Sequence, residues 1–415
     1  MKRLFTFILT LTMAFSFCVN SFAAAATTTT ATETTAATAA TTEASADTSN
    51  TQATSASYGT SKLSGTPDIV AESAVVMDAG TGTVLYGKEA STKRYPASIT
   101  KVMTALLAVE NCNMSDIITY SNAAVNGIEA GSSTAGINVG AKLTVEDSLY
   151  ALMLVSANEA AAAIAEHISG STTEFAKLMT KRAKELGCKN TQFKNPHGLP
   201  DEEHYTTAYD MGLILKEAMK HPEFRKIAGT ISYTLKKSDS LTDTLELWNH
   251  AKILRQNSDY YYEYAEGAKT GFTQVALNTL VTYAKKDNVE LICVILKDHG
   301  ADKSYTDTAN LFKWAFNQVK AVTPLTNFSL KTAMTENSSI DSAKLDQIQL
   351  LNSSYDTNFS VLVKKDFDES TLKTAFKLDE DKKTGRLGYI IISCDGKELG
   401  RKEVTYDITS KQGKA

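Results

Sequence analysis

Ser98 and Lys101 are three residues apart at the start of a predicted helix, residues 98–110. Because side chains at positions i and i+3 lie on the same face of a helix, we expect the hydroxyl and the amine within one turn of each other. Such a pair can serve as a nucleophile and its base, provided that burial or a neighbouring cation lowers the pKa of the lysine from about 10.4. Lys269 is a candidate for that cation.

Two further motifs follow Ser98 along the chain. Ser156-Ala157-Asn158 falls within the most apolar predicted helix, residues 145–168, where its two polar side chains have to find partners. Lys269-Thr270-Gly271 comes 113 residues after Ser156 and leads through Phe272 toward a predicted strand. This spacing leaves room for a helical subdomain between the motifs.

The motifs S-x-x-K, S-x-N and K-T-G together are the signature of penicillin-binding proteins and class A β-lactamases. The chain also holds second copies of two motifs, Ser370-Thr-Leu-Lys373 and Lys383-Thr384-Gly385, but no S-x-N lies between them. Order and spacing therefore favour the set that begins at Ser98.

Residues 69–322 resemble the low-molecular-mass D-alanyl-D-alanine carboxypeptidases, peptidase family S11. Besides the three motifs, the resemblance is carried by segments that begin Tyr95-Pro-Ala-Ser-Ile-Thr-Lys, Asn195-Pro-His-Gly-Leu-Pro and His204-Tyr-Thr-Thr-Ala-Tyr-Asp. It implies a peptidoglycan stem peptide ending in D-Ala-D-Ala as the substrate, β-lactam antibiotics as acylating inhibitors, and no cofactor.

The resemblance also implies roles for the first two motifs. Ser98 would be the acylated nucleophile and Lys101 its general base. Ser156 would pass a proton toward the leaving D-alanine, and Asn158 would bind Lys101 and the substrate amide.

The third motif would bind the substrate. Lys269 and Thr270 would hold the terminal carboxylate, and Gly271 would let the substrate backbone lie close to the strand. The main-chain N–H groups of Ser98 and Phe272 would form the oxyanion hole.

Two features outside the motifs bear on this interpretation. His197 is expected to be structural, because the family transfers protons with Lys and Ser. His197 and His204 lack the H-E-x-x-H spacing of a zinc site, so we expect no metal. Leu277 stands where many family members have glycine, so substrate preference or rate could differ.

Three other functions share part of this pattern. A class A β-lactamase would need E-x-x-x-N between the second and third motifs, and Glu246 and Asn249 are one residue too close. A D,D-endopeptidase differs from a carboxypeptidase only in the shape of its pocket. A penicillin-binding wall protein with little turnover would show a broken motif, and none of the three is broken.

The surrounding pattern predicts an α+β fold of the serine β-lactamase/transpeptidase kind, an antiparallel sheet with helices against it. A hairpin is expected over residues 74–86, with later strands over 280–284 and 291–296. Helices are expected over 172–186 and 308–319, in addition to those that carry the motifs.

The chain divides into four predicted parts. Residues 1–23 have the basic start, apolar run and small-residue end of a signal peptide, and residues 24–66 form an Ala/Thr/Ser-rich tether expected to be disordered. Residues 67–322 would be the catalytic domain, and residues 323–415 a small all-β domain with a hairpin turn at Asp395-Gly396.

Composition agrees with an exported globular enzyme. The 415 residues are 43% hydrophobic, and loss of the signal peptide leaves 41 basic against 47 acidic residues, which argues against nucleic acid as a partner. We expect a location in the cell wall or periplasmic space, with membrane association open, as is the oligomeric state. The remaining cysteines contain no C-x-x-C, which argues against a disulfide framework or a thiolate zinc site.

Overall fold

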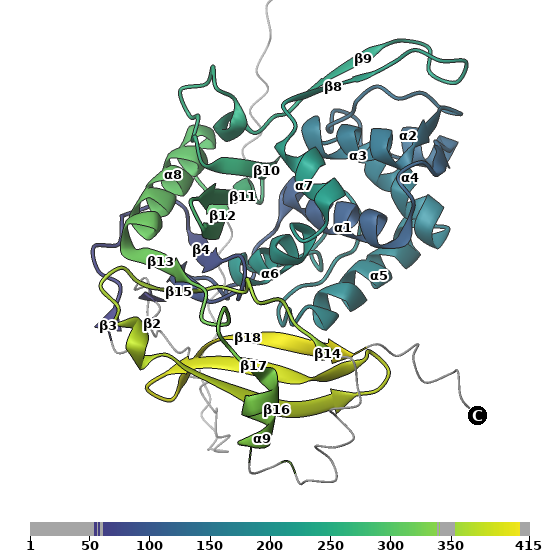
Figure 1. Ribbon diagram of the computed structural model, residues 1–415. Helices are drawn as coiled ribbons and strands as arrows, with labels where there is room; N and C mark the ends of the chain where they lie inside the picture. Colours follow the sequence, from purple (N-terminus) through teal and green to yellow (C-terminus); the bar gives the residue numbers. More distant parts are fainter. Residues whose placement is uncertain (1–53, 56, 59–60, 338–339, 341–352, 407–415) are drawn as a thin grey trace, which may run out of the picture. The chain divides into compact units, whose positions relative to one another are not determined.

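The computed structural model describes residues 54–55, 57–58, 61–337, 340 and 353–406, which belong to one compact unit (Figure 1). The predicted signal peptide, residues 1–23, lies outside the described residues, and so does most of the predicted tether. Within the described part, no helix is long and apolar enough to span a bilayer.

A six-stranded antiparallel sheet forms the centre of the catalytic region, and its strand order is β1-β5-β4-β12-β11-β10. The predicted hairpin and both predicted later strands are confirmed in it. The strands are β1 (Thr54–Ser55), β4 (Ser73–Asp78), β5 (Val84–Lys88), β10 (Ala265–Thr273), β11 (Leu277–Lys286) and β12 (Val289–Asp298).

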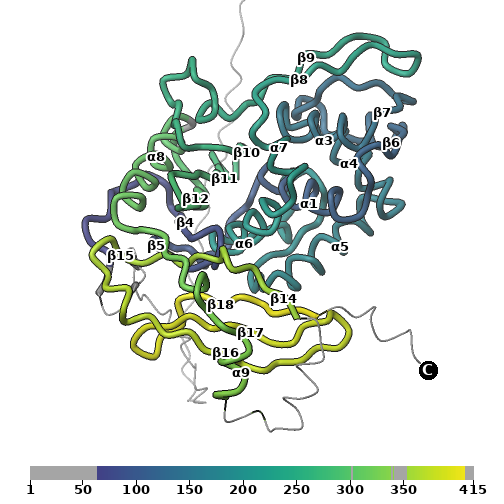
Figure 2. The backbone as a smooth tube through the Cα atoms, in the orientation of Figure 1, coloured from purple at the N-terminus to yellow at the C-terminus, as the bar shows by residue number. Residues whose placement is uncertain are grey.

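Alternation along β12 shows how the sheet is covered on both faces. Leu291, Cys293 and Ile295 pack with α8 (Ala301–Gln318), whereas Ile292 and Val294 face the layer that contains α1 (Lys101–Asn111) and α6 (Ala208–Ala218) (Figures 1 and 2). Successive side chains of a strand point to opposite faces, so both layers bury an apolar surface. Helix α8 begins at Ala301, seven residues before the start predicted at 308. The prediction began too late because the first turns of the helix are mostly polar and show no apolar period.

The helical layer differs from the sequence prediction at one important place. The single helix expected over residues 145–168 is wrong: α3 (Val145–Leu154) and α4 (Asn158–Ser169) are separate helices. Ser156 between them has φ +63°, a left-handed conformation that no continuous right-handed helix contains. Because of this break, the side chains of Ser156 and Asn158 point in directions that they would not have in a continuous helix.

The remaining elements before the C-terminal region are short apart from α5. They are β2 (Ser57–Tyr58), β3 (Ser61–Lys62), η1 (Ala97–Thr100), β6 (Ile117–Thr119), α2 (Asn122–Asn126), β7 (Lys142–Thr144), α5 (Thr172–Glu185), α7 (Pro222–Gly229), β8 (Ser232–Leu235), β9 (Leu245–Trp248) and η2 (Lys252–Leu254).

The C-terminal region is rich in β-structure, as predicted. A four-stranded sheet has the order β14-β18-β17-β16, and β13 pairs with β15. Asp395 and Gly396 both have positive φ, which fits the tight hairpin turn expected between β17 and β18. The elements are β13 (Val319–Val322), α9 (Leu330–Thr335), β14 (Ser353–Ser354), β15 (Val361–Lys364), η3 (Glu369–Thr371), β16 (Lys373–Asp381), β17 (Arg386–Cys394) and β18 (Lys397–Tyr406).

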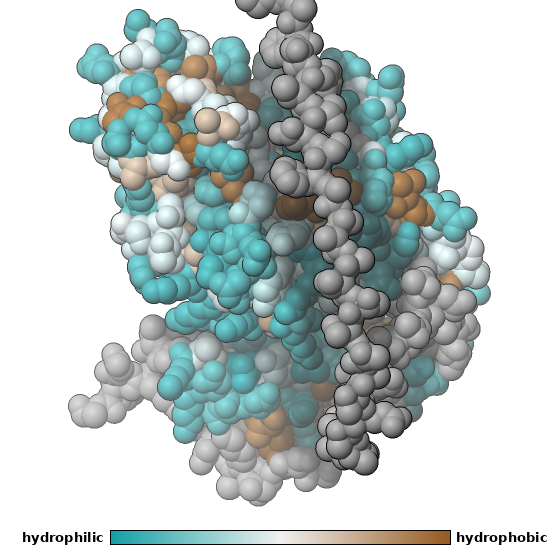
Figure 3. Space-filling view, turned by 180° about the vertical axis from the view of Figure 1, so that it is seen from behind, coloured by the Kyte–Doolittle hydropathy of each residue, from teal (hydrophilic) through white to brown (hydrophobic). Residues whose placement is uncertain are grey.

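The folded structure begins before residue 67, where we expected the tether to end. Strand β1 pairs with β5, Leu63 is buried in the core, and the Trp314 indole N–H donates a hydrogen bond to the Ser64 carbonyl at 2.9 Å. Figure 3 shows hydrophilic residues over most of the coloured surface of one face, with hydrophobic residues in small groups.

Candidate active site

The turn that presents Ser98 is held in a constrained conformation. Ser98 lies in the short helix η1, and Ala97 before it has φ +52°. Such a conformation costs a non-glycine residue about 1–2 kcal/mol, so the surrounding structure has to enforce it. One restraint is the Thr279 hydroxyl of β11, which donates to the Pro96 carbonyl at 2.8 Å.

Two glycines let neighbouring segments approach this turn closely. A Cβ atom at Gly198 would lie 1.9 Å from the Ala97 carbonyl oxygen, and one at Gly271 would lie 2.7 Å from the Ser98 nitrogen. Both distances are far below ordinary contact. Glycine is therefore required at both positions, and β10 lies directly against the backbone of Ser98.

Lys101 joins the first two motifs. Its fully buried Nζ lies 3.1 Å from Ser98 Oγ, 2.7 Å from Asn158 Oδ1 and 2.8 Å from the His197 carbonyl oxygen. Burial, and secondly the charge of Lys269, lowers the pKa of Lys101 well below its usual value. A neutral amine donates two hydrogens to the two carbonyl oxygens, which leaves its lone pair for the Ser98 hydroxyl proton.

Ser156 and Lys269 form the second pair. Lys269 on β10 donates to Ser156 Oγ at 3.1 Å and to the Thr270 carbonyl at 2.7 Å. Burial lowers the pKa of Lys269 to about 7. Lys269 is therefore only partly charged near neutral pH, and Ser156 lies within proton-transfer distance of an amine.

Glu159 is a residue of the site that the sequence reasoning missed. Its buried Oε1 accepts hydrogen bonds from the Thr134 hydroxyl at 2.7 Å and from the backbone N–H groups of Ala135 and Gly136. The Asn158 N–H donates to the Ser133 carbonyl at 2.9 Å, which also attaches the loop of residues 133–136 to α4. An acid directly after Asn158, at the start of an Ala-rich apolar helix, is the signal that could have identified it.

These groups open into one cleft of about 390 Å³. One side of it is β10, an edge strand of the sheet in the described part of the chain, so its outer backbone groups are open to pairing. The lining residues include Ser98, Ser132, Ser133, Ser156, Asn158, Gly198, His250, Lys252, Thr270, Gly271, Phe272, Asn278, Thr279, Asp302, Ser304 and Tyr305.

The two histidines behave as structural groups. The His197 ring accepts from the Leu199 N–H at 3.2 Å, and burial lowers its pKa to about 3. His204 accepts from the Lys194 N–H and lies 2.9 Å from the Thr100 hydroxyl, and burial lowers its pKa to about 4. Both rings are neutral, and the contribution of His197 to the site is its backbone carbonyl.

The second motif copies do not form a site. Ser370 is exposed on η3, and Lys373 begins the following strand β16, so the two do not share a helical turn. Lys383 to Gly385 lie in the turn between β16 and β17.

Leu277, the expected departure from the family pattern, has φ +55° at the start of β11. Glycine adopts this conformation without strain, whereas leucine does not. The next residue, Asn278, lines the cleft.

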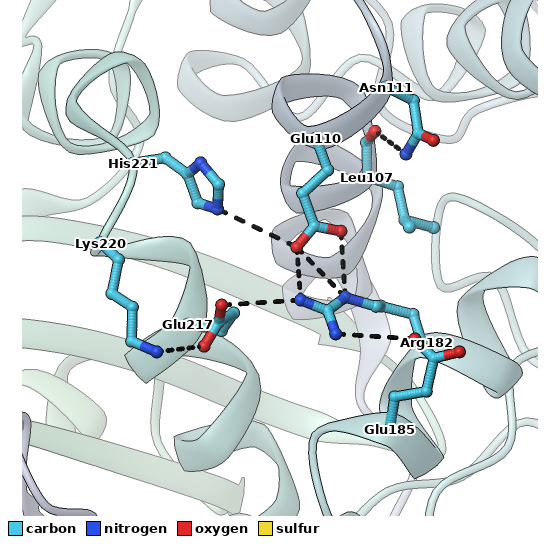
Figure 4. Close-up of polar contacts among 8 residues, drawn as sticks. All are labelled: Leu107, Glu110, Asn111, Arg182, Glu185, Glu217, Lys220 and His221. Carbon is cyan, nitrogen blue, oxygen red and sulfur yellow. Dashed lines mark hydrogen bonds and ion pairs between the residues drawn. The ribbon is translucent and has the colours of Figure 1, made fainter. Parts of the chain in front are cut away.

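A separate cluster could be mistaken for a metal site (Figure 4). Glu110, Glu217 and His221 bring three possible ligand atoms together. However, Arg182 donates to both carboxylate oxygens of Glu110, the shortest contact being 2.6 Å, and lies 3.5 Å from Glu217. The guanidinium already supplies the positive charge, so the cluster is an ion-pair network that joins α1, α5 and α6.

Comparison with known proteins agrees with this geometry. The family model described as D-alanyl-D-alanine carboxypeptidase, peptidase S11, matches residues 60–300. The D-alanyl-D-alanine carboxypeptidase DacF of Bacillus subtilis is 34% identical over 80% of this chain and 84% of its own length.

Solved structures give the same result. A mutant of a Streptomyces DD-transpeptidase is 30% identical and covers 60% of this chain and 99% of its own, with a TM-score of 0.56. The D-alanyl-D-alanine carboxypeptidase DacD of Francisella tularensis is 25% identical and covers 82% of this chain and 96% of its own, with a TM-score of 0.59. This chain belongs to the S11 family of D-alanyl-D-alanine carboxypeptidases.

Proposed function

We propose that this chain is a serine-type D-Ala-D-Ala carboxypeptidase that removes the terminal D-alanine of peptidoglycan stem peptides through an acyl-enzyme on Ser98. The observation that carries the proposal is the position of the buried Lys101 amine, which contacts Ser98 Oγ and Asn158 Oδ1 and has a lowered pKa. This is the arrangement that a hydroxyl nucleophile needs.

In the acylation step, neutral Lys101 takes the Ser98 proton as Oγ attacks the carbonyl carbon of the penultimate D-alanine. The negative charge on the carbonyl oxygen would be met by the N–H groups of Ser98 and Phe272; the contact of β10 with the nucleophile turn at Gly271 supports this pairing. Ser156, hydrogen-bonded to Lys269, then gives a proton to the nitrogen of the departing D-alanine, and the proton that Lys101 took from Ser98 replaces it, so that Lys101 is neutral again.

Substrate would bind as an additional strand along the open edge of β10. Asn158 lines the cleft beside Lys101 and would bind the substrate amide, and Thr270 would contact the terminal carboxylate. Water then attacks the Ser98 ester, Lys101 accepts a proton from that water and returns it to Ser98 Oγ as the ester bond breaks, and the enzyme is regenerated.

Export and domain organisation are part of the proposal. The basic and apolar N-terminal sequence supports a signal peptide, residues 1–23, and a site outside the cytoplasm. The change from the six-stranded sheet to a separate four-stranded sheet supports a boundary after residue 322, between a catalytic domain that begins before residue 67 and a β-rich domain, residues 323–415.

The test is the release of free D-alanine from a peptide ending in D-Ala-D-Ala by the purified chain without residues 1–23, beside Ser98→Ala. We expect release by the wild type and none by the variant. No release by the wild type, with fluorescent penicillin still acylating Ser98, would instead favour an endopeptidase or a binding role.

A further inference from the structure

The substrate of the proposed reaction ends in a free carboxylate, and Lys269 alone is poorly suited to bind it. Lys269 is buried, and its amine already donates to Ser156 Oγ and to the Thr270 carbonyl. Burial also lowers its pKa to about 7, so its positive charge is incomplete near neutral pH. A second cation is needed to favour a substrate carboxylate.

Lys252 is the lysine among the described residues that line the cleft, and the lining contains no arginine. It begins η2, which packs against β10, the strand that carries the K-T-G motif. His250, two residues earlier, also lines the cleft, but burial lowers its pKa and keeps its ring neutral. Lys252 is therefore the half-exposed basic side chain that an incoming anion meets at the cleft wall.

Lys252 has a partner that a substrate can replace. Its Nζ lies 3.1 Å from the carboxylate of Asp302, in the first turn of α8, and the side chains are 48% and 53% exposed. Exposed ion pairs contribute little to stability, so replacing Asp302 by another carboxylate costs little free energy. The Tyr260 ring lies 5.3 Å from the same amine and restricts its position.

We propose that Lys252 binds the free C-terminal carboxylate of the substrate, and that Asp302 occupies the amine until substrate displaces it. The inference rests on the proposed function and adds a specificity-determining residue to it. Lys252 lies at the cleft wall and takes no part in proton transfer. It should therefore affect substrate binding rather than the chemical step.

The first test is steady-state D-alanine release from a tripeptide, L-Lys-D-Ala-D-Ala with both amines acylated, whose one charge is the C-terminal carboxylate. We expect Lys252→Gln to raise KM about fivefold with kcat within twofold of wild type, and Lys252→Arg to retain most of the affinity. Asp302→Asn should lower KM, because the competing carboxylate is gone. The control is Lys303→Gln, which removes a neighbouring exposed lysine that does not line the cleft, and should leave KM unchanged.

The second test measures binding without turnover, so that it does not depend on the proposed reaction. Calorimetry would compare the Kd of the tripeptide, and of its C-terminal amide, for Ser98→Ala protein with and without Lys252→Gln. We expect about a fivefold weaker Kd for the acid and no change for the amide. Equal values for the acid, or an equal loss for the amide, would overturn the inference, and a rise in KM in Asp302→Asn would overturn the exchange with Asp302.

Discussion

Gly271→Ala should impair acylation far more than a typical glycine replacement on the same strand. The added Cβ would lie 2.4 Å from Thr279 Oγ1 and 2.7 Å from Ser98 N, where ordinary contacts begin at about 3.4 Å. The Thr279 side chain can rotate away, but the Ser98 backbone cannot. Strand β10 and the nucleophile turn therefore have to separate by about 0.7 Å, the difference between 3.4 and 2.7 Å.

A separation of this size acts on both the fold and the reaction. Overpacking of this kind costs about 1–3 kcal/mol of stability, and a misplacement near 1 Å at reacting groups can cost about 100-fold in rate. We therefore expect the second-order rate of acylation by fluorescent penicillin to fall about 30- to 100-fold in Gly271→Ala, while the protein stays folded.

The matched control is Gly267→Ala on the same strand, where the new Cβ would meet Ala228 Cβ at an ordinary 3.4 Å. It should acylate within about threefold of wild type. Gly271→Ala combined with Thr279→Ala removes the nearer contact but not the one with Ser98 N, so the rate should stay low. Acylation by Gly271→Ala within twofold of wild type would refute the assigned contact between β10 and the nucleophile.

Further predictions concern pH, backbone strain and the ion-pair network. Because burial lowers the folded-state pKa of Lys269 to about 7, the unfolded chain binds more protons than the folded chain between about pH 7 and 10. The free energy of unfolding should therefore rise with pH in this range, and the rise should be smaller in Lys269→Met. Urea titrations at pH 7 and 9 measure both changes. Leu277→Gly should raise stability by up to about 1 kcal/mol and Leu277→Val should lower it, because φ is +55° at this position; equal stabilities would contradict the strain. Arg182→Met should cost about 2 kcal/mol, because it removes the guanidinium that donates to both carboxylate oxygens of Glu110; Glu217 keeps its ion pair with Lys220. The exposed Lys181→Met on the same helix should cost less than about 0.5 kcal/mol in the same urea assay.

Short-range spacing explains which parts of the site were predictable. Ser98 and Lys101 contact each other because i and i+3 positions share a helical face, and this holds even though Ser98 lies in a 3-10 turn just before α1. The sheet strands were also predictable, since their apolar runs exceed what an exposed segment would contain. Local pattern was sufficient in these cases.

Long-range contacts explain what was missed. The break at Ser156 lies inside an apolar and Ala-rich run whose periodicity continues through it. The contacts at the break are long-range: Lys269 donates to Ser156 Oγ, and the Asn158 N–H donates to the Ser133 carbonyl. Glu159 was passed over because its partners, residues 134–136, are distant in sequence. The length of the tether was overestimated because the core cluster that buries Leu63 includes residues of α8, far along the chain, such as Trp314.

In the proposed mechanism, activation of Ser98 depends on the exclusion of water from Lys101 rather than on the positive charge of Lys101. If Lys101 were protonated, all three hydrogens would point at acceptors, and the one directed at Ser98 Oγ would oppose removal of the hydroxyl proton. Burial removes that hydrogen by lowering the pKa, and the nearby Lys269 adds to the effect. The same burial leaves Lys269 too weakly charged to bind a carboxylate alone. A site that uses buried amines for proton transfer therefore needs a solvated cation for substrate recognition, and Lys252 is placed to supply it.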